Sequence, residues 1–133
     1  MAKIHDLAQR GQTKEILDLL EHKSVEIDIT DDDGETILLI AFSEGHLELA
    51  TLLMNQGADP MVVAHDGTTI LHNAVMSGSP DCLQLASQFV TDLNVTDDDG
   101  DSPLILAVYA KEYECVKWLI ASGCDLNHQS SHG

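Results

Sequence analysis

The sequence predicts an all-α solenoid, in which helix-turn-helix units stack in a row and are joined by β-turn or hairpin loops. Three observations predict this fold class. Glycine recurs every 33 residues, and alanine and leucine positions keep the same register, which is typical of stacked repeats. Each unit also carries two short apolar segments with helical spacing. The recurring positions are Gly34, Gly67, Gly100 and Gly133; Ala41, Ala74 and Ala107; and Leu38, Leu71 and Leu104.

The second unit shows how its helices are expected to begin and end. Gly34 follows an aspartate in a turn, where glycine adopts a positive φ without strain. Thr36 precedes an apolar run and is placed to cap a first helix, which Gly45 ends. A second helix is expected over about residues 47–55, with leucines on one face, and Gly57 closes it.

The third and fourth units vary this design. In the third unit, Ser79 is placed to cap the second helix and Pro80 suits its first position. Val90 stands where that helix would be followed by glycine, and Lys111 replaces the glycine between the two helices of the fourth unit. Because glycine is the residue best suited to a positive φ, we expect these two helix ends to differ in shape.

Length and register together predict one domain over residues 1–133. Residues 1–30 form a first unit without the turn, and the balanced charges of residues 1–23 suit a polar capping unit. Full repeats are expected at residues 31–63, 64–96 and 97–129. Residues 130–133 would begin a further unit or form a tail, which leaves open whether the chain is an excerpt of a longer array.

Each of the three full units carries a related set of local motifs. They are Thr36-Ile37-Leu38-Leu39, Thr69-Ile70-Leu71-His72 and Ser102-Pro103-Leu104-Ile105, with Gly45-His46 and Gly57-Ala58-Asp59. These motifs resemble those of the ankyrin repeat family, and the register extends the resemblance across essentially the whole chain. The resemblance implies an ankyrin-repeat solenoid of about four repeats, the first of them degenerate. It also implies a non-catalytic protein–protein interaction module with a concave binding face, and a hydrogen bond from His72 to a neighbouring loop.

The charge of the chain is strongly acidic, with 23 acidic against 6 basic side chains and a formal net charge of −17. Residues 1–23 are balanced, so the later residues carry the whole excess. Nucleic-acid phosphates and anionic lipid headgroups would be repelled, which excludes nucleic acid and anionic membranes as partners.

Because no apolar run approaches about 18 residues, we expect no membrane span. The first residues lack a hydrophobic signal core and the three cysteines lack metal-type spacing, which predicts an intracellular protein, cytoplasmic first and nuclear as the alternative.

Two acidic runs invite a calcium-loop interpretation, Asp31-Asp32-Asp33-Gly34-Glu35 and Asp97-Asp98-Asp99-Gly100-Asp101. When each glycine is counted as the sixth loop residue, the first ligand would be Ile29 or Val95. The closing glutamate would be Ile40 or Leu106, so an EF-hand is excluded. We expect solvated turns and no specific metal site, while weak, nonspecific divalent binding between adjacent turns stays open.

No other group predicts catalysis or a cofactor. His46 and His72 stand at repeat positions that indicate structural roles, and His65 is expected to be exposed in its turn. Cys82 and Cys115 are equivalent positions and are expected to be small buried hydrophobes, too far apart for a disulfide. The sequence shows no nucleophile–base pair and no phosphate loop, so we expect no enzyme activity.

The candidate binding site is a strip formed by the turn tips and the exposed side of the first helices, here called the acidic strip. Eight of its fifteen residues are acidic and none is basic, which predicts a basic protein partner bound by a monomer, with Met76 and Tyr109 as apolar anchors. The alternative is a passive scaffold or regulatory segment of a larger multidomain protein whose activity lies elsewhere. The strip comprises Asp32, Asp33, Glu35, Ser43, Glu44, His65, Asp66, Thr68, Met76, Ser77, Asp98, Asp99, Asp101, Tyr109 and Ala110.

Overall fold

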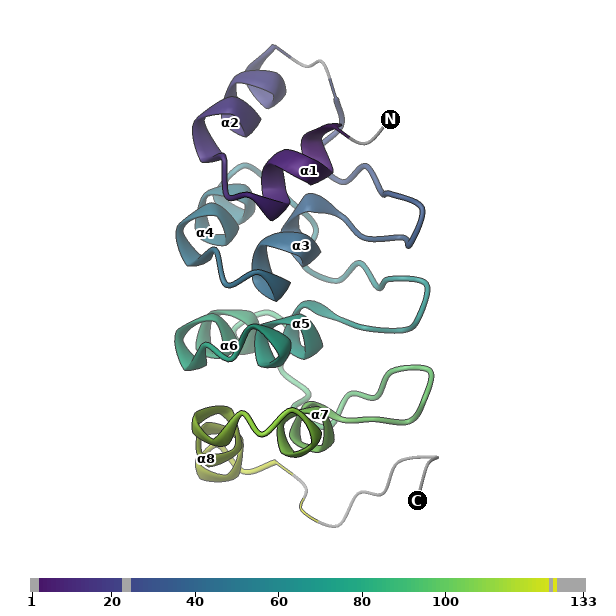
Figure 1. Ribbon diagram of the computed structural model, residues 1–133, viewed down its shortest axis with the longest axis vertical. Coiled ribbons are helices and arrows are strands. Elements are labelled where there is room, and N and C mark those ends of the chain that lie inside the picture. The colour runs from purple at the N-terminus through teal and green to yellow at the C-terminus, as the bar shows by residue number, and fades with distance from the viewer. Residues whose placement is uncertain (1–2, 23–24, 125, 127–133) are drawn as a thin grey trace.

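The computed structural model describes residues 3–22, 25–124 and 126, and this part of the chain contains eight α-helices and no strand. The prediction of an all-α stack of helix-turn-helix units is therefore confirmed (Figure 1). Residues 130–133, the expected start of a further unit or tail, lie outside the described residues. The helices are α1 (Lys3–Gln9), α2 (Thr13–Glu21), α3 (Ile37–Ser43), α4 (Leu47–Asn55), α5 (Ile70–Ser77), α6 (Pro80–Ser87), α7 (Pro103–Tyr109) and α8 (Tyr113–Ala121).

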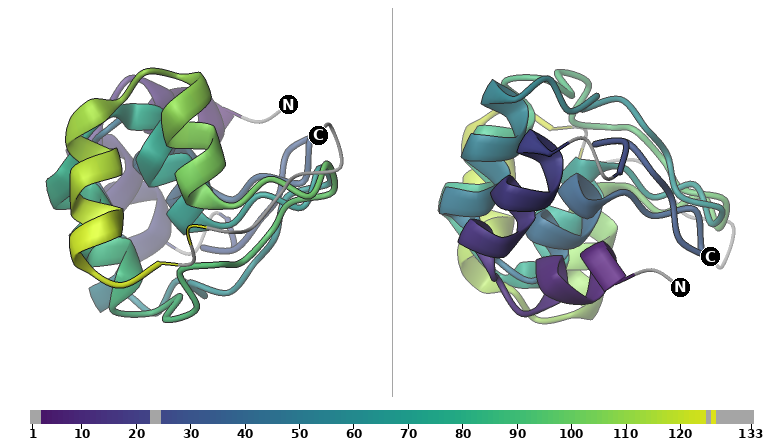
Figure 2. Two further views of the ribbon diagram at one scale, coloured as in Figure 1. Left: turned by 90° about the horizontal axis from the view of Figure 1, so that it is seen from below. Right: turned by 90° about the horizontal axis from the view of Figure 1, so that it is seen from above.

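The helices form two columns that run along the stack. The first helices of the pairs (α1, α3, α5 and α7) contact one another in sequence and form one column, while the second helices form the other. Viewed along the stack in Figure 2, the long loops before α3, α5 and α7 project together to one side. The loops therefore extend the column of first helices and place the turn tips in a row.

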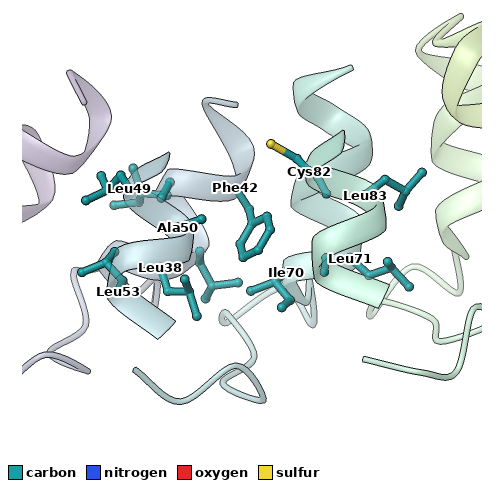
Figure 3. Packing of buried hydrophobic residues seen from close by; sticks show 14 of the residues in the cluster. Leu38, Phe42, Leu49, Ala50, Leu53, Ile70, Leu71, Cys82 and Leu83 are labelled. Atoms are coloured by element: carbon teal, nitrogen blue, oxygen red, sulfur yellow. The ribbon is translucent and has the colours of Figure 1, made fainter. Parts of the chain in front are cut away.

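The core lies between successive helix pairs. Every residue from Ile37 to Phe42 in α3 is buried, and so is every residue from Ile70 to Val75 in α5. In Figure 3, Phe42 and Ile70 lie between the second and third pairs. Isolated helices of seven or eight residues are unstable in water. Packing on both sides therefore holds α3 and α5 in helical form.

Side-chain caps begin helices at Thr36 and Ser79, as the sequence predicts, and also at Ser102. The Thr36 hydroxyl accepts a hydrogen bond from the Leu39 N–H (3.2 Å), and the Ser102 hydroxyl accepts one from the Ile105 N–H (3.3 Å). The Ser79 hydroxyl accepts from the Cys82 N–H (3.2 Å), with Pro80 at the first position of α6. These bonds satisfy N–H groups that have no partner inside the helix.

One of the two expected differences in helix ends is wrong. Lys111 keeps the left-handed backbone of the glycine that it replaces, with φ of 59°, so the end of α7 has the same shape as that of α3. The other difference is present. Val90 has no positive φ, its side chain is buried, and α6 ends one residue earlier than α4 and α8 do relative to the repeat.

The turn tips of neighbouring loops are joined by backbone hydrogen bonds. The His65 N–H donates to the Asp33 carbonyl (2.9 Å), and the Asp98 N–H donates to the Asp66 carbonyl (3.0 Å). Within each loop a second bond closes the turn, as where the Gly67 N–H donates to the Ala64 carbonyl (2.9 Å). The three tips are thus fixed at one spacing and in one register.

His72 forms the hydrogen bond to a neighbouring loop that the family resemblance implies. Its Nδ1 accepts from the Thr69 N–H (3.1 Å), so Nε2 carries the proton and donates to the Asp101 carbonyl of the next loop (3.0 Å). The side chain is fully buried, and this burial lowers the pKa of His72 below its ordinary value. The structural role expected of His72 is confirmed.

Gly67 meets two constraints at once. Its φ of +84° disfavours any residue with a side chain, and a Cβ there would lie 2.7 Å from the backbone nitrogen of Asp98. Gly57 shares only the first constraint, because its φ is +96° but no atom lies within 4 Å of the Cβ position. The two glycines therefore separate backbone strain from close approach between loops.

We predict that Gly67→Ala destabilises the protein more than Gly57→Ala. The left-handed strain should cost about 1–2 kcal/mol at either position. At Gly67 the Asp98 backbone must also move, which should add at least about 1 kcal/mol. Urea unfolding of both variants measures the difference, and equal costs would contradict the role given to the contact between loops.

Candidate partner-binding surface

The structure places most of the acidic strip on the surface. The exposed members are Asp32, Asp33, Glu44, His65, Asp66, Met76, Asp98, Asp99, Tyr109 and Ala110. Glu35, Ser43, Thr68 and Ser77 are partly buried. Asp101 differs from the expectation of an exposed side chain, since only 6% of its surface is accessible. The expectation of an exposed His65 is confirmed.

A hollow of about 310 Å³ lies where α1 meets α3 and the turn tip of the second repeat, which is the first tip along the chain. It brings together four strip residues, Asp33, Glu35, Ser43 and Glu44. It also contains polar side chains that the sequence analysis missed, because the first unit lacks the turn that marked the others. The contact between α1 and α3 places these side chains there. The further lining residues are His5, Asp6, Gln9, Asp31 and Ile40.

A second hollow of about 210 Å³ lies between the first two turn tips. It is lined by Asp33, Glu35, Ala64, His65 and Asp66, so it shares Asp33 and Glu35 with the first hollow. The backbone bond from His65 to Asp33 crosses this region and fixes the distance between the two tips. The two hollows therefore adjoin at Asp33 and Glu35, and strip residues of the second and third repeats line them.

Asp33, Asp66 and Asp98 at the turn tips form no ion pair with a basic side chain of the described part of the chain. Two ion pairs of the described residues join Arg10 to Asp6 (2.8 Å) and Lys117 to Glu114 (3.4 Å), and neither includes these three aspartates. Partial burial and then the charge of Asp31 raise the pKa of Glu35 above its ordinary value, although a hydrogen bond from the Asn73 amide (3.4 Å) opposes the shift.

Two apolar side chains accompany the carboxylates. Met76 near the end of α5 is 55% exposed and Tyr109 at the end of α7 is 61% exposed, and they are equivalent positions of adjacent repeats. Large apolar groups exposed beside polar ones are typical of interaction surfaces. The strip therefore offers two apolar contacts along with its acidic turn tips.

The cysteines contribute no activated thiol to this surface. Cys82 and Cys115 are fully buried and free, as expected from their equivalent positions. Burial, followed by the nearby charge of Glu112, raises the pKa of Cys115 to about 11, so the group stays a thiol near neutral pH.

Within the described residues, no helix has the length and apolar character needed to cross a membrane.

Comparison with known proteins agrees with the repeat architecture. A family model described as ankyrin repeats in three copies matches residues 4–87 and again residues 56–130. The two matches overlap and together span almost the whole chain. A search of curated proteins found no match to the sequence.

We predict that Glu35→Gln stabilises the protein at neutral pH. A raised pKa means that the folded state binds more protons than the unfolded state, so Glu35 reduces stability as pH rises through the glutamate range. Glutamine removes this charge and keeps an oxygen that can accept from Asn73. The gain should be below about 1 kcal/mol, the scale of partly exposed charges. Urea unfolding should show the gain at pH 7 and a smaller gain at pH 4; a loss of stability at pH 7 would contradict the account.

Proposed function

Because the chain belongs to the ankyrin repeat family, we propose that it binds a basic protein partner through the acidic strip. Ankyrin repeats are generally protein–protein interaction modules and are typically not enzymes. The observation that carries the proposal is the row of turn tips, which backbone bonds between loops hold on one side of the stack. Asp33, Asp66 and Asp98 in this row form no ion pair with a described basic residue.

The backbone bonds between loops support a recognition role for this row. They hold Asp33, Asp66 and Asp98 in fixed positions before any partner arrives. A preorganised set of like charges loses little conformational freedom on binding, and it attracts a partner of opposite charge from a distance. The pKa of Glu35 is raised first by partial burial and then by the charge of Asp31, and a Lys/Arg-rich segment lying along the tips would relieve the second, electrostatic part.

Apolar contacts would supply affinity that charge alone does not give. Exposed rim charges contribute mainly to association rate, whereas buried apolar anchors dominate binding energy. Met76 and Tyr109 are the strip residues suited to this role. The proposed partner therefore carries apolar side chains among its basic ones and binds a monomer of this chain, in the cytoplasm or, as the alternative, in the nucleus.

A second candidate function is that of a scaffold segment within a larger protein, and the outer face of α7 favours it. Val108 is 53% exposed, whereas the equivalent residues Phe42 and Val75 are fully buried against the next helix pair. Leu104 and Leu106 are likewise only partly buried. A further repeat stacked on α7 would cover these side chains as α5 covers those of α3.

We predict that reversing two tip charges weakens binding of a basic peptide. The probe is a Lys/Arg-rich peptide containing leucine and tyrosine, with an acidic peptide of the same length as the negative control. Affinity of the Asp33→Lys/Asp98→Lys variant should fall by about tenfold or more, equivalent to roughly 1.4 kcal/mol. Calorimetric titration at low and physiological salt measures the loss, and wild-type affinity should fall as salt rises.

The matched control is Glu48→Lys/Asp81→Lys, which makes the same change in net charge at exposed sites on α4 and α6. Its affinity should change by less than about threefold, because distant exposed charges are largely screened. Equal losses in the two variants, or wild-type binding that does not respond to salt, would show that the strip is not the site. Amide shifts mapped on the wild type should then identify another face.

A further inference from the structure

We propose that Asp97, Asp99 and Asp101 form a binding site for a hard divalent cation, Ca²⁺ or Mg²⁺, in the turn of the fourth repeat. The site shares Asp99 and Asp101 with the acidic strip, but the proposal does not depend on the proposed function, because it concerns cation binding by the chain alone. Two independent observations carry it: the convergence of three carboxylates, and an oxygen of Asp101 that is buried without a partner.

The first observation is geometric. Each of the three aspartates offers one carboxylate oxygen, and these oxygens all lie within 4.8 Å of one another. The turn holds them there, because Oδ1 of Asp97 accepts from the N–H groups of Asp99 (3.0 Å) and Asp101 (2.9 Å). Oxygens of several carboxylates around a tight turn are the ligands that Ca²⁺ and Mg²⁺ take in proteins.

The second observation concerns Asp101 itself. Its side chain is 6% exposed, and its Oδ1 is buried with no hydrogen-bond partner. A buried carboxylate oxygen without a hydrogen bond or counter-ion is costly and rare in native proteins. A cation bound by the converging carboxylates would provide the compensation that the protein does not.

The backbone of Asp101 is held in place on two sides. Its N–H donates to Asp97, and its carbonyl accepts from Nε2 of His72 (3.0 Å) and from the Asp97 N–H (3.0 Å). These bonds tie the residue to its own turn and to the preceding repeat. The main-chain position from which the Asp101 carboxylate projects is therefore set by the stacking of the repeats.

The turn of the second repeat has the same spacing of acidic residues but lacks a buried carboxylate oxygen without a partner. Asp31, Asp33 and Glu35 also place carboxylate oxygens within 4.8 Å of one another. There, however, Glu35 is only partly buried and accepts a hydrogen bond from Asn73 (3.4 Å). His5 lines the hollow beside this turn, and its Nδ1 is buried without a hydrogen-bond partner, but His5 does not belong to the group of converging carboxylates. The proposal is therefore confined to the turn of the fourth repeat.

The site differs from the calcium loop that the sequence analysis excluded. An EF-hand loop has glycine as its sixth residue, after the first three ligand positions. In the proposed site, Gly100 lies between the second and third donors, Asp99 and Asp101. Without a closing bidentate glutamate, the three carboxylates leave several coordination positions to water. We therefore expect weak binding, with a dissociation constant on the order of 10⁻⁴ to 10⁻³ M for Ca²⁺.

The test is calorimetric and NMR titration of the full chain with CaCl₂ and, separately, MgCl₂, at an ionic strength held constant with KCl. Saturable binding should occur, with amide shifts concentrated at residues 97–102 rather than 31–36. Asp101→Asn should weaken binding about tenfold or more, and Asp81→Asn, which removes one exposed charge elsewhere, should leave it unchanged within about twofold.

The Ca²⁺ and Mg²⁺ arms decide which cation the site takes. The proposal would be overturned by the absence of saturable binding up to about 10 mM of either ion, well above the expected constant. Equal weakening by Asp101→Asn and Asp81→Asn would also overturn it. Circular dichroism checks that each variant is folded. If Asp101→Asn does not fold, Asp99→Asn replaces it, and amide shifts spread evenly over both turns of the wild type would count against the site.

Discussion

The burial of the first helices between their neighbours is the interaction on which the rest of this structure depends. α3 and α5 have seven and eight residues, too few to remain helical alone, yet all their residues from the first turn to Phe42 and Val75 are buried. Stacking thus produces the helices as well as joining them. It also sets the spacing of the loops, so the tips at Asp33, Asp66 and Asp98 form one row.

The same stacking creates the electrostatic cost of the molecule. Stacking brings the carboxylates of neighbouring turn tips closer together than they would be in an unfolded chain. Glu35 shows a cost of this packing, because partial burial first, and then the charge of Asp31 in its own turn, raise its pKa. His72 shows the opposite arrangement, because its neutral ring is fully bonded between two loops. The stack therefore combines an interior in which His72 is fully hydrogen-bonded with an edge that carries many exposed carboxylates.

Local features of the fold could be predicted from the sequence, and features that depend on three-dimensional packing could not. The cap at Thr36 and the bounds of α4 follow from residues close in sequence, and both are confirmed. The left-handed backbone of Lys111 was missed because the surrounding stack imposes it on a residue that does not favour it. At the site, the contribution of His5 and the burial of Asp101 required the placement of neighbouring repeats.

Native-state amide hydrogen exchange tests the central role of stacking most directly, because it reports opening free energies helix by helix. The account predicts the highest protection in α3 and α5, which are buried on both sides, and lower protection in α7, whose outer face at Val108 is exposed. Protection in α7 equal to or greater than that in α5 would contradict it, since stability would then not follow from burial between adjacent repeats.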